Sequence, residues 1–217
     1  MTWRARCREI AAIQAADEAR RAWQWPEGSV PPFSHRWEHV QEVVRLALWL
    51  AGVTGADREI TEAAAWLHDV CKGEPQHAAL GAAESLRILP QTDFPPAKIG
   101  AVADAIRQHE GMTRPKKAPP LQPLEAAILW DADKLSKLGV QALAFSLSAP
   151  YLAGLSLAER RRNCLEFVEG TLTRTVASMN TAPARALAEE RHRNMRTVLA
   201  LWAQEEEDRL FTVKETL

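Results

Sequence analysis

The sequence predicts an all-α protein, from its composition, its hydrophobic spacing and its pattern of breaks. Ala, Leu, Glu and Arg, which favour helices, dominate the 217 residues, whereas the Val-Ile-Thr alternation typical of strands is nearly absent. Apolar residues recur at helical spacing in successive segments, and prolines and glycines separate these segments. The chain is long enough for one large core, or for one domain with a helical extension.

The first part of the chain is predicted to form helices over residues 3–24, 35–52, 58–72 and 77–89. The segment 35–52 has the clearest pattern, because its apolar positions follow the i, i+3, i+4, i+7 rule. Helix-breaking residues follow each segment in turn: Pro26, Gly28, Pro31 and Pro32; then Gly52 and Gly55; then Gly73 and Pro75; then Pro90.

The next helix is expected to start at Pro95-Pro96, to run to about His109 and to end near Gly111. Residues 111–123 are rich in proline and are predicted to form a loop, which could act as a lid over a substrate. Helices are predicted again over residues 124–138, 156–179 and 183–210. We therefore expect three regions: an N-terminal helix with a proline-rich connection (1–32), a helical core (33–140), and C-terminal helices that pack on the core or on a partner subunit (141–217).

Composition excludes several classes of protein. The formal net charge is -1, which gives no overall attraction to nucleic acid or to anionic membranes. No window approaches the roughly 20 apolar residues of a membrane span. The three cysteines, Cys7, Cys71 and Cys164, lie far apart and are expected to be free thiols. With no apparent signal peptide, the sequence predicts a cytoplasmic location.

The dipeptide His68-Asp69 ends an apolar helical run and is the first candidate for chemistry. Adjacent helical residues project about 100° apart, so the two side chains can still converge on one ion between their directions. His39 precedes Val43 by one turn and is expected to face the core. His35 shares a helix face with His39, and it could either join a metal site or lie exposed at the helix start.

Further candidates lie downstream. His109 ends the stripe Ile99, Val102 and Ile106, and a buried imidazole needs a hydrogen-bond partner or a metal. Asp131 and Asp133 are about 200° apart around their helix, so only one can face a site, and periodicity does not choose between them. A buried carboxylate is costly unless it is paired or bound to a cation, so this helix is expected to supply a ligand. Lys72, one turn after His68, could meet a phosphate or complement the helix dipole.

Three segments in this order resemble the HD superfamily of metal-dependent phosphohydrolases: His39–Ala47, Ala65–Lys72 and Ile128–Leu135. They carry a first histidine, a His-Asp doublet and a distal aspartate preceded by alanine, and the similarity covers about residues 33–140. It implies an HD-domain helical bundle with additional C-terminal helices. It also implies that His39, His68, Asp69 and Asp133 bind a divalent metal, which favours Asp133 over Asp131.

The chain is also similar to small bacterial HD proteins that contain His-x-x-x-Gly-Ala and Ile-x-x-His. Here the first motif begins at His77 and the second ends at His109. In dinuclear members the equivalent histidines help to hold a second metal, so the resemblance makes His77 and His109 second-site candidates. Many small relatives have an acid where this chain has Arg36, in the segment His35–His39; the arginine could instead meet a substrate phosphate.

The expected function is hydrolysis of a phosphoester in a small nucleotide-like molecule by a metal-activated water. Mixed imidazole and carboxylate ligands suit one or two ions of Mn, Fe, Co, Ni or Zn. Asp69 could both bind metal and orient the water, and the candidates for phosphate neutralisation are Lys72, Arg107, Lys134 and Arg36. Two alternatives remain: a di-iron HD-type oxygenase, and a non-catalytic nucleotide-binding or regulatory HD module. The C-terminal helices could support a homodimer.

Overall fold

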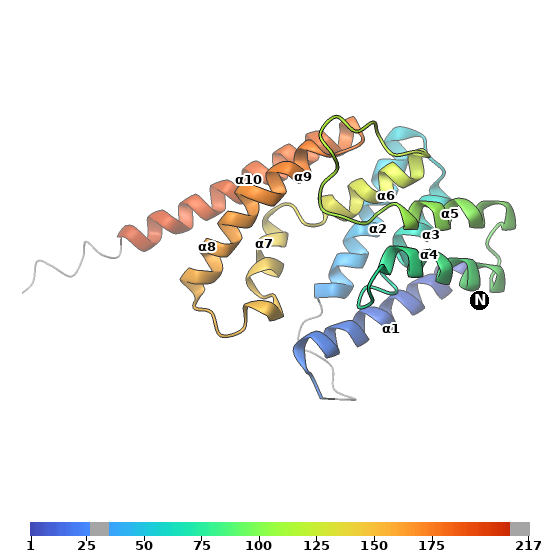
Figure 1. Ribbon diagram of the computed structural model, residues 1–217, viewed down its shortest axis with the longest axis horizontal. Helices are drawn as coiled ribbons and strands as arrows, with labels where there is room; N and C mark the ends of the chain where they lie inside the picture. Colours follow the sequence, from blue (N-terminus) through green and yellow to red (C-terminus); the bar gives the residue numbers. More distant parts are fainter. Residues whose placement is uncertain (27–34, 209–217) are drawn as a thin grey trace, which may run out of the picture.

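The structure, a computed structural model, describes residues 1–26 and 35–208, and all regular structure within these two ranges is helical. The prediction of an all-α fold is confirmed. Figure 1 shows the arrangement of the helices, which run in the order α1 (Trp3–Trp23), α2 (His35–Thr54), α3 (Arg58–Leu67), α4 (His77–Ile88), α5 (Ile99–Arg107), α6 (Leu124–Leu135), α7 (Val140–Leu147), α8 (Leu157–Phe167), α9 (Thr173–Ala177) and α10 (Ala182–Asp208).

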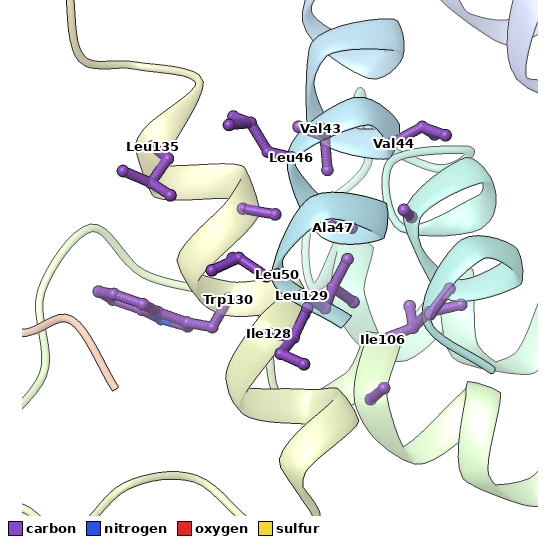
Figure 2. Packing of buried hydrophobic residues seen from close by; sticks show 14 of the residues in the cluster. Val43, Val44, Leu46, Ala47, Leu50, Ile106, Ile128, Leu129, Trp130 and Leu135 are labelled. Carbon is purple, nitrogen blue, oxygen red and sulfur yellow. The ribbon is translucent and has the colours of Figure 1, made fainter. Parts of the chain in front are cut away.

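Helix α2 lies at the centre of the core and contacts α1, α3 and α6. Figure 2 shows its side chains Val43 and Leu50 among those of the neighbouring helices, including Leu129 of α6 and Ile106 of α5, all of them fully buried. Burying a side chain of this size contributes about 1.5–3 kcal/mol. Because α2 packs against several helices at once, it needs the wide apolar stripe that its sequence predicts.

The C-terminal helices form a second packed group. Helix α10 contacts α6, α7, α8 and α9, and in Figure 1 its far end extends with α7 and α8 away from α1 and α4. No helix among the described residues has the length and apolarity needed to cross a membrane.

Several predicted helix boundaries were wrong. The helix expected over 58–72 ends at Leu67, and the chain continues in turns stabilised by bonds such as Lys72 N–H to Asp69 C=O (3.1 Å). The helix expected over 156–179 is divided by a π-helical turn at Val168–Leu172, whose two end residues are both fully buried. Helix α7 was not predicted, since residues 136–155 lack a clear period.

The segment Gly111–Pro123 is a loop, as predicted, and it lies against α9 and the start of α10 (Figure 1). The backbone N–H of Arg114 donates to Ser178 Oγ (3.0 Å), and that of Leu121 donates to Asn180 Oδ1 (3.0 Å). Thr175 Oγ1 in turn donates to the carbonyl of Met112 (2.8 Å). These bonds attach the loop to the C-terminal helices.

Candidate metal centre

The predicted metal ligands come from separate segments and converge in the core. His39 lies on α2, His68 and Asp69 follow the end of α3, and His77 is the first residue of α4. His109 follows α5, and Asp133 lies in the last turn of α6. All of them are buried except His77, whose side chain is 14% exposed. Helix ends and turns therefore place these side chains, which are far apart in the sequence, in one cluster.

Four side chains form the first group of donor atoms. His39 Nε2 lies 3.4 Å from Asp69 Oδ2, 3.4 Å from Asp133 Oδ1 and 3.4 Å from His68 Nε2. His68 Nε2 lies 3.4 Å from the same oxygen of Asp69. Tetrahedral ligands about 2.1 Å from one ion are separated from each other by about 3.4 Å. The donor atoms of His39, His68 and Asp69 lie close enough together to bind one ion, and Asp133 lies beside His39.

Hydrogen bonds fix the tautomers of the histidines. The Nδ1–H of His68 donates to the carbonyl of Ala65 (2.8 Å), and that of His109 donates to the carbonyl of Ile106 (2.6 Å). The Nδ1–H of His39 donates to Ser136 Oγ (2.9 Å), because the Ser136 hydroxyl proton is itself donated to the backbone carbonyl of Asp133. Each ring therefore presents a bare Nε2 lone pair to the cluster. This arrangement is the usual support of a metal-binding imidazole.

The imidazole of His39 is neutral. Burial, reinforced by the charge of Lys137, lowers the pKa of His39 to about 3. Its Nε2 atom lies 3.4 Å from His68 Nε2, so a cation between the two rings could bind both nitrogens.

A second group of donors lies on the other side of Asp69. Asp69 Oδ1 is 3.5 Å from His109 Nε2 and 3.7 Å from His77 Nε2. Both Asp69 Oδ1 and His109 Nε2 are buried without a hydrogen-bond partner among the described residues. Leaving such atoms unpaired is costly, and a second cation between them would remove the cost.

The structure shows which of the two aspartates faces the cluster, a choice that hydrophobic periodicity left open. Asp133 faces His39, whereas Asp131 accepts hydrogen bonds from the backbone and side chain of both Asn180 and Thr181, at 2.8–2.9 Å. Asp131 thus anchors the start of α10. It is not part of the cluster.

Cationic side chains surround the two carboxylates of the cluster. Arg36 donates to Asp69 Oδ2 and, through Nε, to Glu18 (2.7 Å). Lys134 bonds to Asp133 and to the carbonyl of His109 (2.9 Å). Burial raises the pKa of Asp133, but the charge of Lys134 and its neighbours outweighs burial and holds this pKa well below its usual range.

Lys72 occupies a different position from these buried cations. Its Nζ lies 3.4 Å from Asp69 Oδ1 and 3.2 Å from His77 Nε2, and its side chain is 31% exposed. It stands at the edge of a groove of about 390 Å³ between α1, the turn after α3 and α4. The groove is lined by residues that include Arg21, Asp69, Lys72, Gly73 and Glu74. Its volume lies within the range of small-molecule sites, about 300–1,000 Å³.

Two predicted candidates are not brought into the cluster. Arg107 is half-exposed and pairs with Asp104 on the surface of α5 (2.5 Å). His35 belongs to neither donor group, and its ring lies 6.5 Å from that of Phe145.

Sequence reasoning also missed three contributors. Ser136 holds His39, Lys137 pairs with Asp133, and Glu18 pairs with Arg36. Ser136 and Lys137 follow Asp133 by three and four residues, and this helical spacing could have predicted that they lie beside it. Nothing in the sequence marks Glu18.

The region that contains the cluster matches a known family. A family described as the HD domain matches residues 36–138, which contain all the residues of the two donor groups. The uncharacterized protein YpgQ of Bacillus subtilis (strain 168) is 29% identical over 162 residues, which span 74% of this chain and 79% of YpgQ.

Solved structures share the fold. The structure of Bacillus subtilis YpgQ in complex with ADP has a TM-score of 0.62 at 24% identity, and the match covers 88% of this chain and 97% of YpgQ. The structure of a predicted HD superfamily hydrolase from an uncultured Thermotogales bacterium has a TM-score of 0.57 at 24% identity, with 91% of each chain covered.

Proposed function

Because the chain belongs to the HD superfamily, we propose that it is a metal-dependent phosphohydrolase acting on a phosphoester of a nucleotide. The observation that carries the proposal is the set of buried, bare donor atoms. The Nε2 atoms of His39, His68 and His109 face the oxygens of Asp69, and no hydrogen bond satisfies Asp69 Oδ1 or His109 Nε2 among the described residues. A cation is the partner that suits lone pairs and carboxylate oxygens at once.

The proposed first site is formed by His39, His68, Asp69 and Asp133, and the proposed second site by Asp69, His77 and His109. The donor set suits Mn, Fe, Co, Ni or Zn better than Mg or Ca. A bound ion of this kind supplies a water of lowered pKa and polarises a phosphoryl oxygen. In this proposal Asp69 is shared by both sites, since its Oδ2 faces one group and its Oδ1 the other.

The charge around the cluster indicates an anionic substrate. The carboxylates of Asp69 and Asp133 are already outnumbered by four cations that contact them directly: Arg36, Lys72, Lys134 and Lys137. One or two divalent ions would add to this positive charge, which phosphate groups would neutralise.

Individual roles follow from access to the groove. Lys72 is partly exposed at the groove and is proposed to bind a phosphoryl oxygen of the substrate. Arg36 and Lys134 are enclosed and bonded to the carboxylates, so we propose that they orient Asp69 and Asp133. Asp69 is proposed to position the attacking water through the oxygen that faces His109.

Two observations support a nucleotide as the substrate class. The groove beside Asp69 has a volume suited to a small phosphorylated molecule. The protein YpgQ, which shares the fold, has been crystallised in complex with ADP.

The test combines metal content with turnover. Elemental analysis of the wild type should find one or two transition-metal ions per chain, with none in Asp69→Ala and fewer than the wild type in His109→Gln. Asp104→Asn, a surface carboxylate on α5, is the matched control and should keep the full content. A metal-supplemented screen should then yield phosphate or nucleoside from nucleoside phosphates, and mononucleotides from dinucleoside polyphosphates. A wild type that binds no metal after reconstitution would overturn the proposal, and metal binding without turnover would favour a non-catalytic module.

A further inference from the structure

A second cavity, of about 600 Å³, lies between the loop after α5 and the C-terminal helices. Its loop side consists of residues 113–118 and Pro120, and its other side consists of residues from α9 and the start of α10. It shares no lining residue with the candidate metal centre or with the groove beside Asp69. It therefore calls for an explanation of its own.

The lining of this cavity carries charge of one sign only. Five cationic side chains line it and no acidic side chain does, although the whole chain has a net charge of -1; the cations are Arg114, Lys116, Lys117, Arg174 and Arg185. None of them forms an ion pair with any residue in the described ranges, whereas Arg36, Arg87, Arg107 and many others do. Unpaired like charges held close together repel each other, and an anionic ligand would compensate them.

Neutral acceptors orient the arginines without neutralising them. Arg114 Nη1 donates to Asn180 Oδ1, and its Nη2 donates to the carbonyl of Pro119 (2.6 Å). Arg185 Nη2 donates to the carbonyl of Met179 (2.8 Å). The guanidinium groups thus keep their full charge in fixed positions, which is the arrangement suited to binding phosphate.

The two lysines provide the exposed part of the lining. Lys116 and Lys117 are exposed, and no polar partner is recorded for either side chain within the part of the chain that the structure describes. Lys117 adopts φ +69°, a left-handed conformation that is unusual for a residue other than glycine. Both ammonium groups are therefore free to meet a ligand at the mouth of the cavity.

We propose that this cavity is a binding site for a nucleoside di- or triphosphate, separate from the candidate metal centre. The lysines with Arg174 and Arg185 would bind the phosphates, and the remaining lining includes the apolar groups of Pro115, Ala118, Pro120 and Ala177, against which a base or ribose could pack. The volume of the cavity lies within the range of about 300–1,000 Å³ typical of small-molecule sites. The proposal does not depend on catalysis.

The cavity is linked to the candidate metal centre through one side chain. Asn180, in the cavity wall, bonds Arg114 and Leu121 from the loop and donates to Asp131 on α6 (2.9 Å). Asp131 precedes Asp133 by two residues. These hydrogen bonds join the cavity wall to the helix that carries a candidate metal ligand.

The test measures ADP binding by calorimetry in EDTA, with Lys72→Ala as the background so that the candidate catalytic groove is impaired. Lys116→Ala/Lys117→Ala, introduced together, should weaken ADP binding by about tenfold or more, because two phosphate contacts are lost. The matched control, Arg8→Ala/Arg162→Ala, removes the same charge from exposed arginines that have no ion pair among the described residues, and it should bind ADP as the background does. ADP should also slow trypsin cleavage after Lys116 and Lys117 in the background protein.

Equal ADP affinity in the two double variants would overturn the proposal, as would an absence of ADP binding to the background protein. A short RNA that binds more tightly than ADP and displaces it would also overturn it, in favour of a nucleic-acid surface. Because metal and turnover are excluded from the measurement, none of these outcomes bears on the proposed phosphohydrolase activity.

Discussion

Two buried carboxylates on α6 differ in their partners far more than in their burial. Asp131 is 0% exposed and Asp133 is 3% exposed, and they are separated by a single residue. Asp131 accepts four hydrogen bonds from the neutral donors of Asn180 and Thr181. Asp133 contacts two lysines and lies 3.4 Å from the bare Nε2 of His39.

This contrast shows that burial alone does not mark a functional carboxylate. Neutral, fixed donors satisfy Asp131 completely, so it holds the start of α10 and needs no further partner. Burial raises the pKa of Asp131, whereas the lysines hold the pKa of Asp133 well below its usual range in spite of burial. A permanently charged carboxylate that faces imidazole lone pairs is the arrangement that a metal ion requires.

The largest effect is expected from Asp133→Asn, which keeps the shape of the side chain and removes its charge. The variant should lose the ion of the first site. We expect kcat/KM to fall about 1,000-fold, because an activated water supplies several kcal/mol of transition-state stabilisation. Elemental analysis and steady-state kinetics on the nucleotide found in the screen would measure both losses. Full metal content with normal activity would show that Asp133 is structural, like Asp131.

Asp131→Ala should have the opposite profile. It leaves the donors of Asn180 and Thr181 without their acceptor, so we expect the free energy of unfolding to fall by about 2 kcal/mol. Urea unfolding of the metal-free protein would measure this change. The folded variant should keep the metal content of the wild type, and loss of metal from a protein with unchanged stability would contradict the distinction between the two aspartates.

The sequence could predict that this helix contributes a carboxylate, but not which one. Both aspartates continue an apolar stripe, and both are buried, so hydrophobic spacing carries no information that separates them. The partners that distinguish them, Asn180 and Thr181, lie about fifty residues further along the chain, and only tertiary packing brings them to α6. The resemblance to the HD superfamily was what favoured Asp133.

The same reasoning explains the rest of the candidate site. The inward position of His109 follows from its helical stripe, and the structure places it beside Asp69. The turn at His68–Lys72 was predicted as helix, because local propensity does not reveal where tertiary contacts end a helix. The pairing of Arg36 with Glu18 depends on how α1 packs, so the sequence suggested only a free cation that could meet phosphate.

Ser136→Ala should have a smaller effect, confined to metal binding. Ser136 Oγ accepts the Nδ1–H of His39 and so keeps the ring in the tautomer that presents Nε2 to the cluster. Loss of such a support typically weakens metal affinity by about tenfold or more. Competition with a fluorescent chelator would measure the change. Ser148→Ala, at the exposed end of α7, is the matched control and should bind metal as the wild type does; equal affinity in the two variants would show that Ser136 has no role at the centre.

The smallest effect is expected from Glu18→Gln, which tests whether α1 influences the centre at all. Arg36 divides its guanidinium between Glu18 and Asp69, and its side chain is only 13% exposed. Removing the charge of Glu18 leaves Asp69 as the only carboxylate paired with Arg36, so the arginine should compete more strongly with the metal for Asp69 Oδ2. We expect metal affinity to fall by about threefold, the scale of a partly exposed ion pair. Glu9→Gln, which removes an exposed pair with Arg6 on the same helix, should leave the affinity unchanged. Unchanged or higher affinity in Glu18→Gln would show that α1 does not influence the centre through Arg36.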